Sequence, residues 1–251
     1  MRGNPSPRRL LLGRAEFAAL VAAADVTLPP GWQPADTDRL DRLGVHPALL
    51  VNLAVLAHPA VLVDTTVRVG ELGTRCVHAV AGTLGASLFA LPDDGVELSL
   101  FAATDLGREL ARAAAVDHRP ITVTLTGVPR PAPRGTVRLA ALRELGIARL
   151  LAGADPESVA ATLATLELPS AEADLAEEVS ARTDGVLRSV VTGRHGPDRV
   201  AVGQVTWLHT DAGWVGVDPV PDGSGRRLVR LVPVTAADLG TWAAPALAEV
   251  L

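Results

Sequence analysis

The stretch VLVDTTVRVGELGTRCVHAVAGTLGASLFALPDDGVELSLFA, residues 61–102, decides the fold. It holds four short runs rich in β-branched and apolar residues, a composition typical of β-strands. The connections between the runs are short and contain glycines or the turn Pro92–Gly95. Short connections join antiparallel neighbours, so the stretch predicts a four-stranded antiparallel meander.

Helices are predicted on either side of this meander. Phe17, Leu20 and Val21 recur at helical spacing in the first of them, residues 14–24. A second helix is predicted over residues 47–56, whose leucines share one face. A third is predicted over residues 105–115, after the fourth run, with the Thr104 hydroxyl as its N-cap.

The same order of elements returns later in the chain. A strand-like run at 121–127 is followed by VPRPAPRG, residues 128–135, whose prolines mark the best internal boundary. Three further helices are predicted at 137–152, 156–166 and 170–183. Strands return in the runs GVLRSVVTG, RVAVGQVTWLHT, GWVGVDP and RLVRLVPV, and Thr235 is predicted to cap a final helix that reaches Leu251.

Two segments that close these units resemble one another. LFAATDLGRELARAA, residues 100–114, aligns with LVPVTAADLGTWAAPA, residues 231–246, and places Asp105-Leu106-Gly107 against Asp238-Leu239-Gly240. We therefore predict an α+β fold of two halves, residues 1–128 and 129–251, related by a quasi-two-fold internal repeat. Its central, mostly antiparallel sheet would be flanked by two helical clusters in one compact unit.

Composition excludes several classes of protein. All 23 basic residues are arginine, so the lysine of a Walker A loop and the Schiff-base lysine of a pyridoxal enzyme are both absent. The net charge of −5 argues against a nucleic-acid partner. A single cysteine allows no intrachain disulfide, and no apolar run is long enough to span a bilayer. We expect a cytoplasmic protein without membrane insertion.

Residues that could carry chemistry do not form a convincing site. The histidines show no i, i+4 spacing that would hold a metal; they are His46, His58, His78, His118, His195 and His209. Cys76 and His78 share one face of a strand, but positions two apart are about 7 Å from each other, so an inert buried thiol is the better interpretation. Ser87 lacks the spacing of a nucleophile elbow. No catalytic residue, metal or cofactor is predicted.

Arginines and tryptophans in the second half allow two interpretations. Arg226 and Arg227 follow the PDGSG turn, and Arg230 lies on the strand after it, where charges either protect a sheet edge or contact a partner. Trp207 and Trp214 lie on neighbouring predicted strands and either fill the core or contribute to an interface.

The second half also resembles a known family. VGQVTWLHTDAGWVGVDP, residues 202–219, and RLVRLVPVTAADLGTWAAPALAEVL, residues 227–251, resemble the C-terminal region of the EspG family, chaperones of actinobacterial type VII (ESX) secretion. The opening LLLGRAEFAALVAAADVTLPPGW, residues 10–32, resembles the first helix and loop of that family. Trp207-Leu208-His209-Thr210 stands where a W-L-D-T pattern is expected, with His209 at the acidic position.

This resemblance implies a fold with a central antiparallel sheet between two helical clusters. It also implies a cytosolic chaperone that binds the tip of the PPE subunit in a PE–PPE heterodimer, keeps the pair soluble, helps deliver it for export and catalyses no reaction. The residues expected on or near the binding surface are Trp207, His209, Trp214, Arg227 and Arg230. The free chain is expected to be a monomer or a weak homodimer.

Two other interpretations remain open at the level of sequence. The first is an enzyme or small-ligand-binding protein with a pocket between the two halves, which would need polar groups to converge there. The second is a purely structural subunit that forms a permanent complex rather than a releasable one.

Overall fold

One ten-stranded sheet organises the chain in the computed structural model, which describes residues 8–34, 46–115, 130–152, 155–195, 199–221, 223 and 227–250. Its strands are β1 (Arg8–Leu12), β2 (Val61–Val69), β3 (Leu72–Ala81), β4 (Leu84–Ala90), β5 (Val96–Ala102), β6 (Gly135–Arg138), β7 (Thr183–His195), β8 (Arg199–Thr210), β9 (Gly213–Val220) and β10 (Leu228–Val234). The α-helices are α1 (Arg14–Ala24), α2 (Pro47–Ala57), α3 (Leu106–Ala114), α4 (Leu139–Ala152), α5 (Pro156–Thr165), α6 (Ser170–Arg182) and α7 (Leu239–Ala248).

The strand order is β1-β5-β4-β3-β2-β7-β8-β9-β10-β6, and every neighbouring pair is antiparallel. The order runs outward from the β2–β7 pair in the same way on both sides, with β3, β4, β5 and β1 on one side and β8, β9, β10 and β6 on the other. The predicted antiparallel α+β fold is confirmed. The internal repeat and the division at residue 128 stay predictions.

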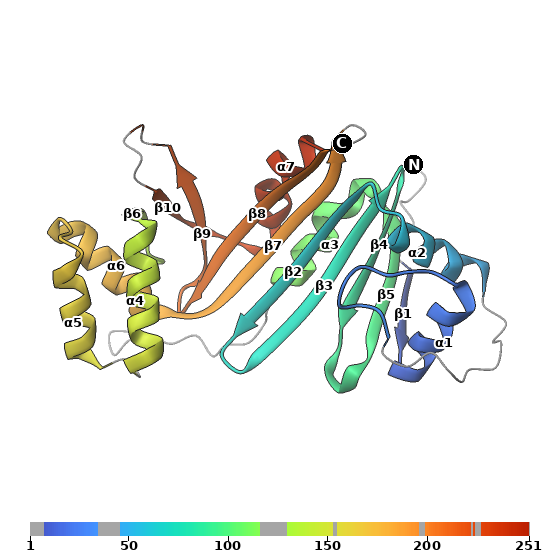
Figure 1. Cartoon of the computed structure of the whole chain (residues 1–251), viewed down its shortest axis with the longest axis horizontal. Coiled ribbons are helices and arrows are strands. Elements are labelled where there is room, and N and C mark those ends of the chain that lie inside the picture. The colour runs from blue at the N-terminus through green and yellow to red at the C-terminus, as the bar shows by residue number, and fades with distance from the viewer. Residues whose placement is uncertain are drawn as a thin grey trace.

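Helices α3 and α7 cover the middle of one face of the sheet (Figure 1). Leu187 and Val191 of β7, with Val205 and Trp207 of β8, point toward them, because alternate residues of a strand face the same side. Together with side chains of β2, β3, β5, β9, α3 and α7 they form the largest buried cluster among the described residues, so strands of both halves contribute to it.

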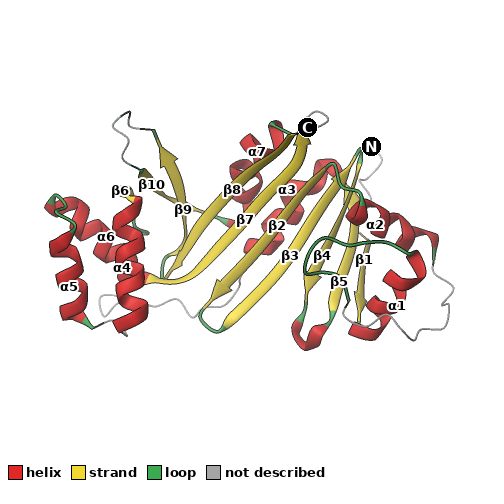
Figure 2. Ribbon diagram, in the orientation of Figure 1, coloured by secondary structure: helices red, strands yellow, loops and turns green. Residues whose placement is uncertain are grey.

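Within the described residues, the opposite face is covered only at its two ends (Figures 1 and 2). At one end α1, α2 and Trp32 pack on β3, β4 and β5. At the other end α4, α5 and α6 pack on β6, β9 and β10. Leu62 of β2 and Leu208 of β8 contact the margins of these two clusters, so the sheet between them is left without a helical layer on this face.

Four local predictions need comment. The strands β1 and β6 were missed, and the helix predicted from Val137 begins at Leu139, because the residues before it pair with β10. Thr104 does not cap α3; it lies inside a short 3-10 turn, and Asp105 occupies the N-cap position. Thr235 caps the 3-10 turn Ala236–Asp238, where its N–H and hydroxyl both donate to Asp238, but Asp238 occupies the N-cap position of α7, and the helix ends at Ala248. The strand predicted at 121–127 lies outside the described residues.

No helix in the described part of the chain is long and apolar enough to cross a bilayer.

Candidate functional site

The uncovered middle of the sheet is the candidate functional site, called the open face below. Register pairs Thr66 with Arg188 and Arg188 with Thr206, so these three side chains lie side by side across β2, β7 and β8. The open face consists of Asp64, Thr66, Arg68, Val186, Arg188, Val190, Val200, Val202, Gln204 and Thr206.

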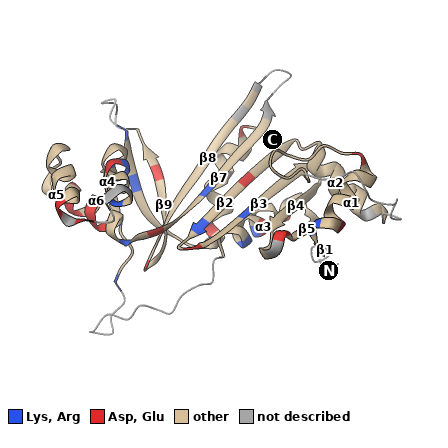
Figure 3. Cartoon of the chain, turned by 60° about the horizontal axis from the view of Figure 1, so that its bottom comes forward, with Lys and Arg blue, Asp and Glu red and all other residues tan. Residues whose placement is uncertain are grey.

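Apolar and polar groups are mixed on this surface. Val200 is 65% exposed and Val202 is 66% exposed, which is unusual for valine on a long strand. Beside them the Arg188 Nε donates to the Gln204 Oε1 at 3.2 Å, and the Gln204 amide donates to Thr206 at 2.9 Å. Figure 3 shows charged residues on β2 and β3 and almost none on β8. A broad surface with apolar groups and an oriented arginine suits a protein partner better than a small ligand.

Arg75 on β3 fixes one border of the open face. Its guanidinium donates to Asp64 at 2.6 Å, and this bond raises the pKa of Arg75. The same group donates to the Pro30 carbonyl oxygen at 3.1 Å and lies 5.5 Å from the centre of the Trp32 ring. Gly31 has a φ of +79°, and a Cβ there would overlap the guanidinium of Arg75. One side chain thus ties the loop after α1 to the sheet.

A second exposed apolar surface lies on α4, at the other end of the same face. Leu139, Ile147 and Leu150 fall within one stripe of the helix, opposite to Ala141 and Leu145, which are buried against β9 and β10. Leu150 is 82% exposed. The helical cluster therefore presents apolar groups to solvent on its outer side.

Three of the five expected contact residues lie in the interior, on the side of α3 and α7. Trp207 is fully buried and packs edge-to-face on Trp242, with ring centres 6.0 Å apart. Trp214 is also buried, and its indole N–H donates to the Ala114 carbonyl oxygen at 3.0 Å. The His209 ring lies 4.7 Å from that of Trp214. The structure brings these three rings together but not onto the open face, so a direct contact is not available to Trp207 in this conformation.

His209 is held by an acidic group from the neighbouring strand. Its Nδ1 lies 2.8 Å from the Asp184 Oδ1. The acidic position expected from the family pattern is therefore occupied by a base that pairs with a carboxylate instead. This arrangement is compatible with a structural role for the position.

The other two expected residues are exposed. Arg227 precedes β10, and Arg230 on β10 lies 2.5 Å from Asp218 of β9. β10 pairs with β9 on one side and with β6 on the other, so the interpretation of these arginines as protection of a sheet edge is wrong. Arg226 lies outside the described residues. The contact role of all five residues stays a prediction.

The surroundings of Cys76 and His78 do not favour the nucleophile and base considered from the sequence. Burial raises the pKa of the Cys76 thiol, so the thiolate is disfavoured. Burial also lowers the pKa of His78 to about 4, and its Nε2 lies 3.2 Å from the Glu109 carbonyl oxygen. Ser87 shares a 2.6 Å hydrogen bond with Ser99 in the interior. These groups support the interpretation of an inert core.

A buried ion network fastens β1 and β5 to α3 on the covered face. The fully buried Glu109 accepts from Arg112 at 2.6 Å, and Arg112 also bonds to Glu97. Arg9 reaches this network from β1, with its Nη2 3.6 Å from the Glu109 Oε1. Among the described residues, no group of three His, Cys, Asp or Glu side chains could hold a metal ion.

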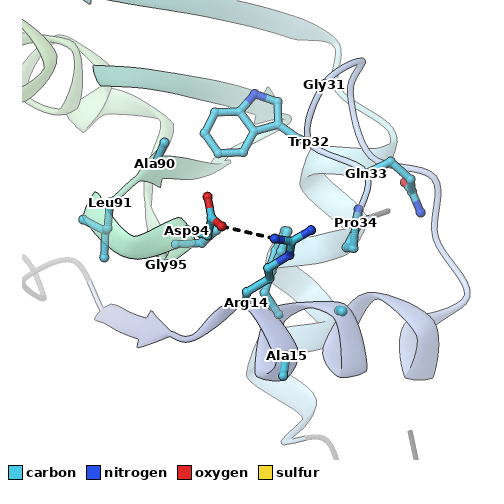
Figure 4. Close-up of a pocket in the computed structure, with 13 residues that line it drawn as sticks. Arg14, Ala15, Gly31, Trp32, Gln33, Pro34, Ala90, Leu91, Asp94 and Gly95 are labelled. Atoms are coloured by element: carbon cyan, nitrogen blue, oxygen red, sulfur yellow. Dashed lines mark hydrogen bonds and ion pairs between the residues drawn. The ribbon is translucent and has the colours of Figure 1, made fainter. Parts of the chain in front are cut away.

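Described residues of the first half line two cavities that bear on the enzyme interpretation. One, of about 710 Å³, lies between α1, the loop Gly31–Pro34 and the turn before β5, with Trp32 on one wall and the Arg14–Asp94 ion pair across it (Figure 4). The other, of about 800 Å³, lies beside the β2–β3 hairpin and the end of α3. The lining of both cavities comes from residues before 128, so neither supplies the pocket between halves that the enzyme interpretation requires.

Sequence reasoning missed the open face itself. The alternation of β7 and β8 separates Arg188 from Leu187 and Gln204 from Val205, and this signal was available. Which of the two faces stays uncovered depends on where the helices pack, and no local pattern contains that information.

Comparisons with known proteins agree with this architecture. The model of the EspG family matches residues 14–244. A similar solved structure is that of the Mycobacterium tuberculosis type VII secretion system chaperone EspG5 in complex with the PE25–PPE41 dimer, with a TM-score of 0.65, 13% identity and 96% of each chain covered. At this identity the likeness is one of fold. No curated protein matches the chain.

Proposed function

The chain belongs to the EspG family, and from this membership we propose that it is a cytosolic chaperone of a type VII secretion system that binds a PE–PPE heterodimer. The structurally similar EspG5 is described as such a chaperone, in complex with the PE25–PPE41 dimer. The proposed role includes keeping the heterodimer soluble and directing it to export.

The observation that carries the proposal is the open face. A helical tip that leaves its own apolar side exposed would self-associate unless another surface covers it. The valines of β7 and β8 offer apolar area, while Arg188 is oriented by Gln204 to donate to a carbonyl or carboxylate oxygen of the partner. The helical clusters at the two ends of this face restrict the directions in which a partner can lie.

The five residues expected from the resemblance take two different parts in this proposal. Arg227 and Arg230 are exposed and lie outside the open face, and Arg230 points to the opposite side of β10 from Val229 and Leu231, which pack under α4–α6. They are proposed to form a separate direct contact with the partner. Trp207, His209 and Trp214 are buried behind the sheet and are proposed to support the strands that carry the open face. Substitution of either arginine should weaken binding without loss of stability. Substitution of Trp207, His209 or Trp214 should instead lower the stability of the fold.

The direct test is complex formation with PE–PPE pairs from the source organism, each co-expressed with this chain and sized by gel filtration with light scattering. The double variant Val186→Asp, Arg188→Glu should lose the complex that the native chain forms. Leu84→Asp is a matched control, since Leu84 is exposed to the same 39% as Val186 but lies on β4, outside the open face. A complex that survives the double variant would contradict the proposed surface, and no complex with any pair would contradict the proposed function.

Solubility is tested separately. A PE–PPE heterodimer alone should scatter light increasingly with time, and an equimolar amount of this chain should suppress the scattering. The Val186→Asp, Arg188→Glu variant should suppress it less than the Leu84→Asp control. Equal scattering with and without the chain would mean that it binds the heterodimer without protecting it.

A further inference from the structure

The outer edge of β8 is unpaired over most of its length. β8 pairs with β7 from Arg199 to Thr210, but it pairs with β9 only from Trp207 to Thr210. Residues Arg199–Thr206 therefore have no partner strand on their outer side among the described residues. β9 and β10 diverge from β8 beyond this short pairing, as Figure 1 shows. An edge inside the sheet is left open, in addition to the two edges at β1 and β6.

Main-chain groups on this edge point outward at alternate residues. The Gly70 N–H, directly after β2, donates to the Asp184 carbonyl oxygen of β7. The main-chain groups of even-numbered β7 residues therefore bond to β2, and those of odd-numbered β7 residues bond to β8. Because Leu187 of β7 pairs with Trp207 of β8, the main-chain groups of odd-numbered β8 residues bond to β7. The even-numbered residues of β8 therefore direct their N–H and C=O groups to the open edge, as Val202, Gln204 and Thr206 do.

The edge lacks the usual protection against pairing. Natural edge strands carry charges, prolines or bulges that deter an added strand. Between Val200 and Thr206 the sequence VAVGQVT contains no charged residue and no proline, and its register with β7 is regular. Two exposed valines on the open face lie directly beside the edge.

We propose that this edge takes an extended, uncharged peptide segment of a partner as an added β-strand. The unpaired groups specify an extended main chain, because only a strand presents donors and acceptors at the matching repeat. The side chains beside the edge are uncharged on both faces: Val202 and Gln204 on one, and Gly203 under Ala246 of α7 on the other. β-branched residues alternating with small polar ones fit such a site.

The surroundings favour a single extended chain over a second folded copy. In the described part of the chain, residues 217–220 of β9 pair with β10 on one side and have no partner strand on the side that faces β8. A chain that enters beside β8 therefore has β9 and β10 on its other side, which obstructs the approach of another whole sheet. The site is continuous with the open face through Val202 and Gln204, yet it binds main chain rather than side chains.

The test uses a fluorophore-labelled, blocked peptide of alternating threonine and valine, seven residues long, titrated with the full chain and followed by anisotropy. A matched peptide carries N-methyl groups on alternate residues and so lacks the donors of one edge. It should bind at least about tenfold more weakly, since each lost hydrogen bond removes a factor of a few in affinity. Equal binding of both peptides would overturn strand addition.

Two variants test the edge itself. Gln204→Pro removes an outward N–H and blocks the approach of a strand, while the fold tolerates proline at an edge. It should weaken peptide binding at least about tenfold. Gln204→Ala removes the same side chain but keeps the main-chain N–H, and should bind the peptide at least about tenfold more tightly than Gln204→Pro. Circular dichroism establishes that both variants are folded, and equal binding to Gln204→Pro would refute the proposal.

Hydrogen exchange identifies the β8 residues that the peptide contacts. In the dilute free chain the amides of Val202, Gln204 and Thr206 should exchange fast, those of Gly203 and Val205 slowly, and the peptide should protect the first three. Protection of these amides without peptide would refute the proposal, and protection that grows with chain concentration would assign the edge to a second copy. The Val186→Asp, Arg188→Glu variant should keep peptide binding, which separates this inference from the proposed function.

Discussion

Gly107 and Gly240 meet where α3 packs against α7. A Cβ atom on Gly240 would lie 2.9 Å from the Gly107 Cα, whereas a Cβ on Gly107 would lie 3.9 Å from the Gly240 Cα. The two glycines occupy the same place in the two aligned motifs of the sequence, and each is the second residue of its helix. The contact therefore joins the two halves of the chain at their corresponding positions, on the covered face of the sheet.

This asymmetry predicts different effects of the same substitution. Gly240→Ala forces two helix backbones apart and should lower the free energy of unfolding by about 1–3 kcal/mol, less the gain of up to about 1 kcal/mol from the better helix propensity of alanine. Gly107→Ala makes only an ordinary contact and should leave stability unchanged or slightly raised. Urea unfolding followed by circular dichroism compares the two, and equal effects would show that the helices are not in close contact.

A pH dependence follows from His78. Burial lowers its pKa from 6.5 to about 4 in the folded chain. Between these values the unfolded chain binds one more proton, so the free energy of unfolding should fall as the pH drops from 6.5 to 4 and level off below it. The shift corresponds to about 3 kcal/mol at most. Unfolding series at several pH values for the native chain and for His78→Phe should differ in slope only in this window.

Arg112 should matter more than its neighbour on the same helix. Arg112→Met leaves the fully buried Glu109 and the nearby Glu97 without their main cation, and should lower the free energy of unfolding by about 3 kcal/mol. Arg108→Met is the control, because Arg108 is 63% exposed and its ion pair with Asp105 contributes about 1 kcal/mol or less. Thermal melts of both variants measure the difference. A loss in Arg108→Met as large as that in Arg112→Met would contradict the network.

Arg75 should control the loop at the border of the open face. Arg75→Ala removes the donors to the Pro30 and Gly31 carbonyl oxygens and the cation over Trp32, so hydrogen exchange in the loop Leu28–Trp32 should accelerate. Arg68→Ala changes an exposed arginine of β2 and should leave the exchange of this loop unchanged. If both variants behaved alike, Arg75 would not be what holds the loop.

Much of the fold could be predicted because its signals are local. The meander of β2 to β5 alternates β-branched residues between glycine turns, and α3 follows with its own periodicity, so each element is encoded within about ten residues. β1 and β6 were not predictable in this way. Each is four or five residues long and is held by a strand distant in the chain, so no internal pattern distinguishes it from a loop.

The candidate site, too, depends partly on local sequence and partly on tertiary packing. Alternation in the sequence determines that Leu187 and Trp207 lie on one side of the sheet and Arg188 and Thr206 on the other, because a strand repeats every two residues. It does not determine which side the helices cover. Trp207 could equally have been a contact residue, and Val202 a core residue, until α3 and α7 packed on one face and left the other open. That choice depends on contacts between residues far apart in the chain, which only the tertiary structure decides.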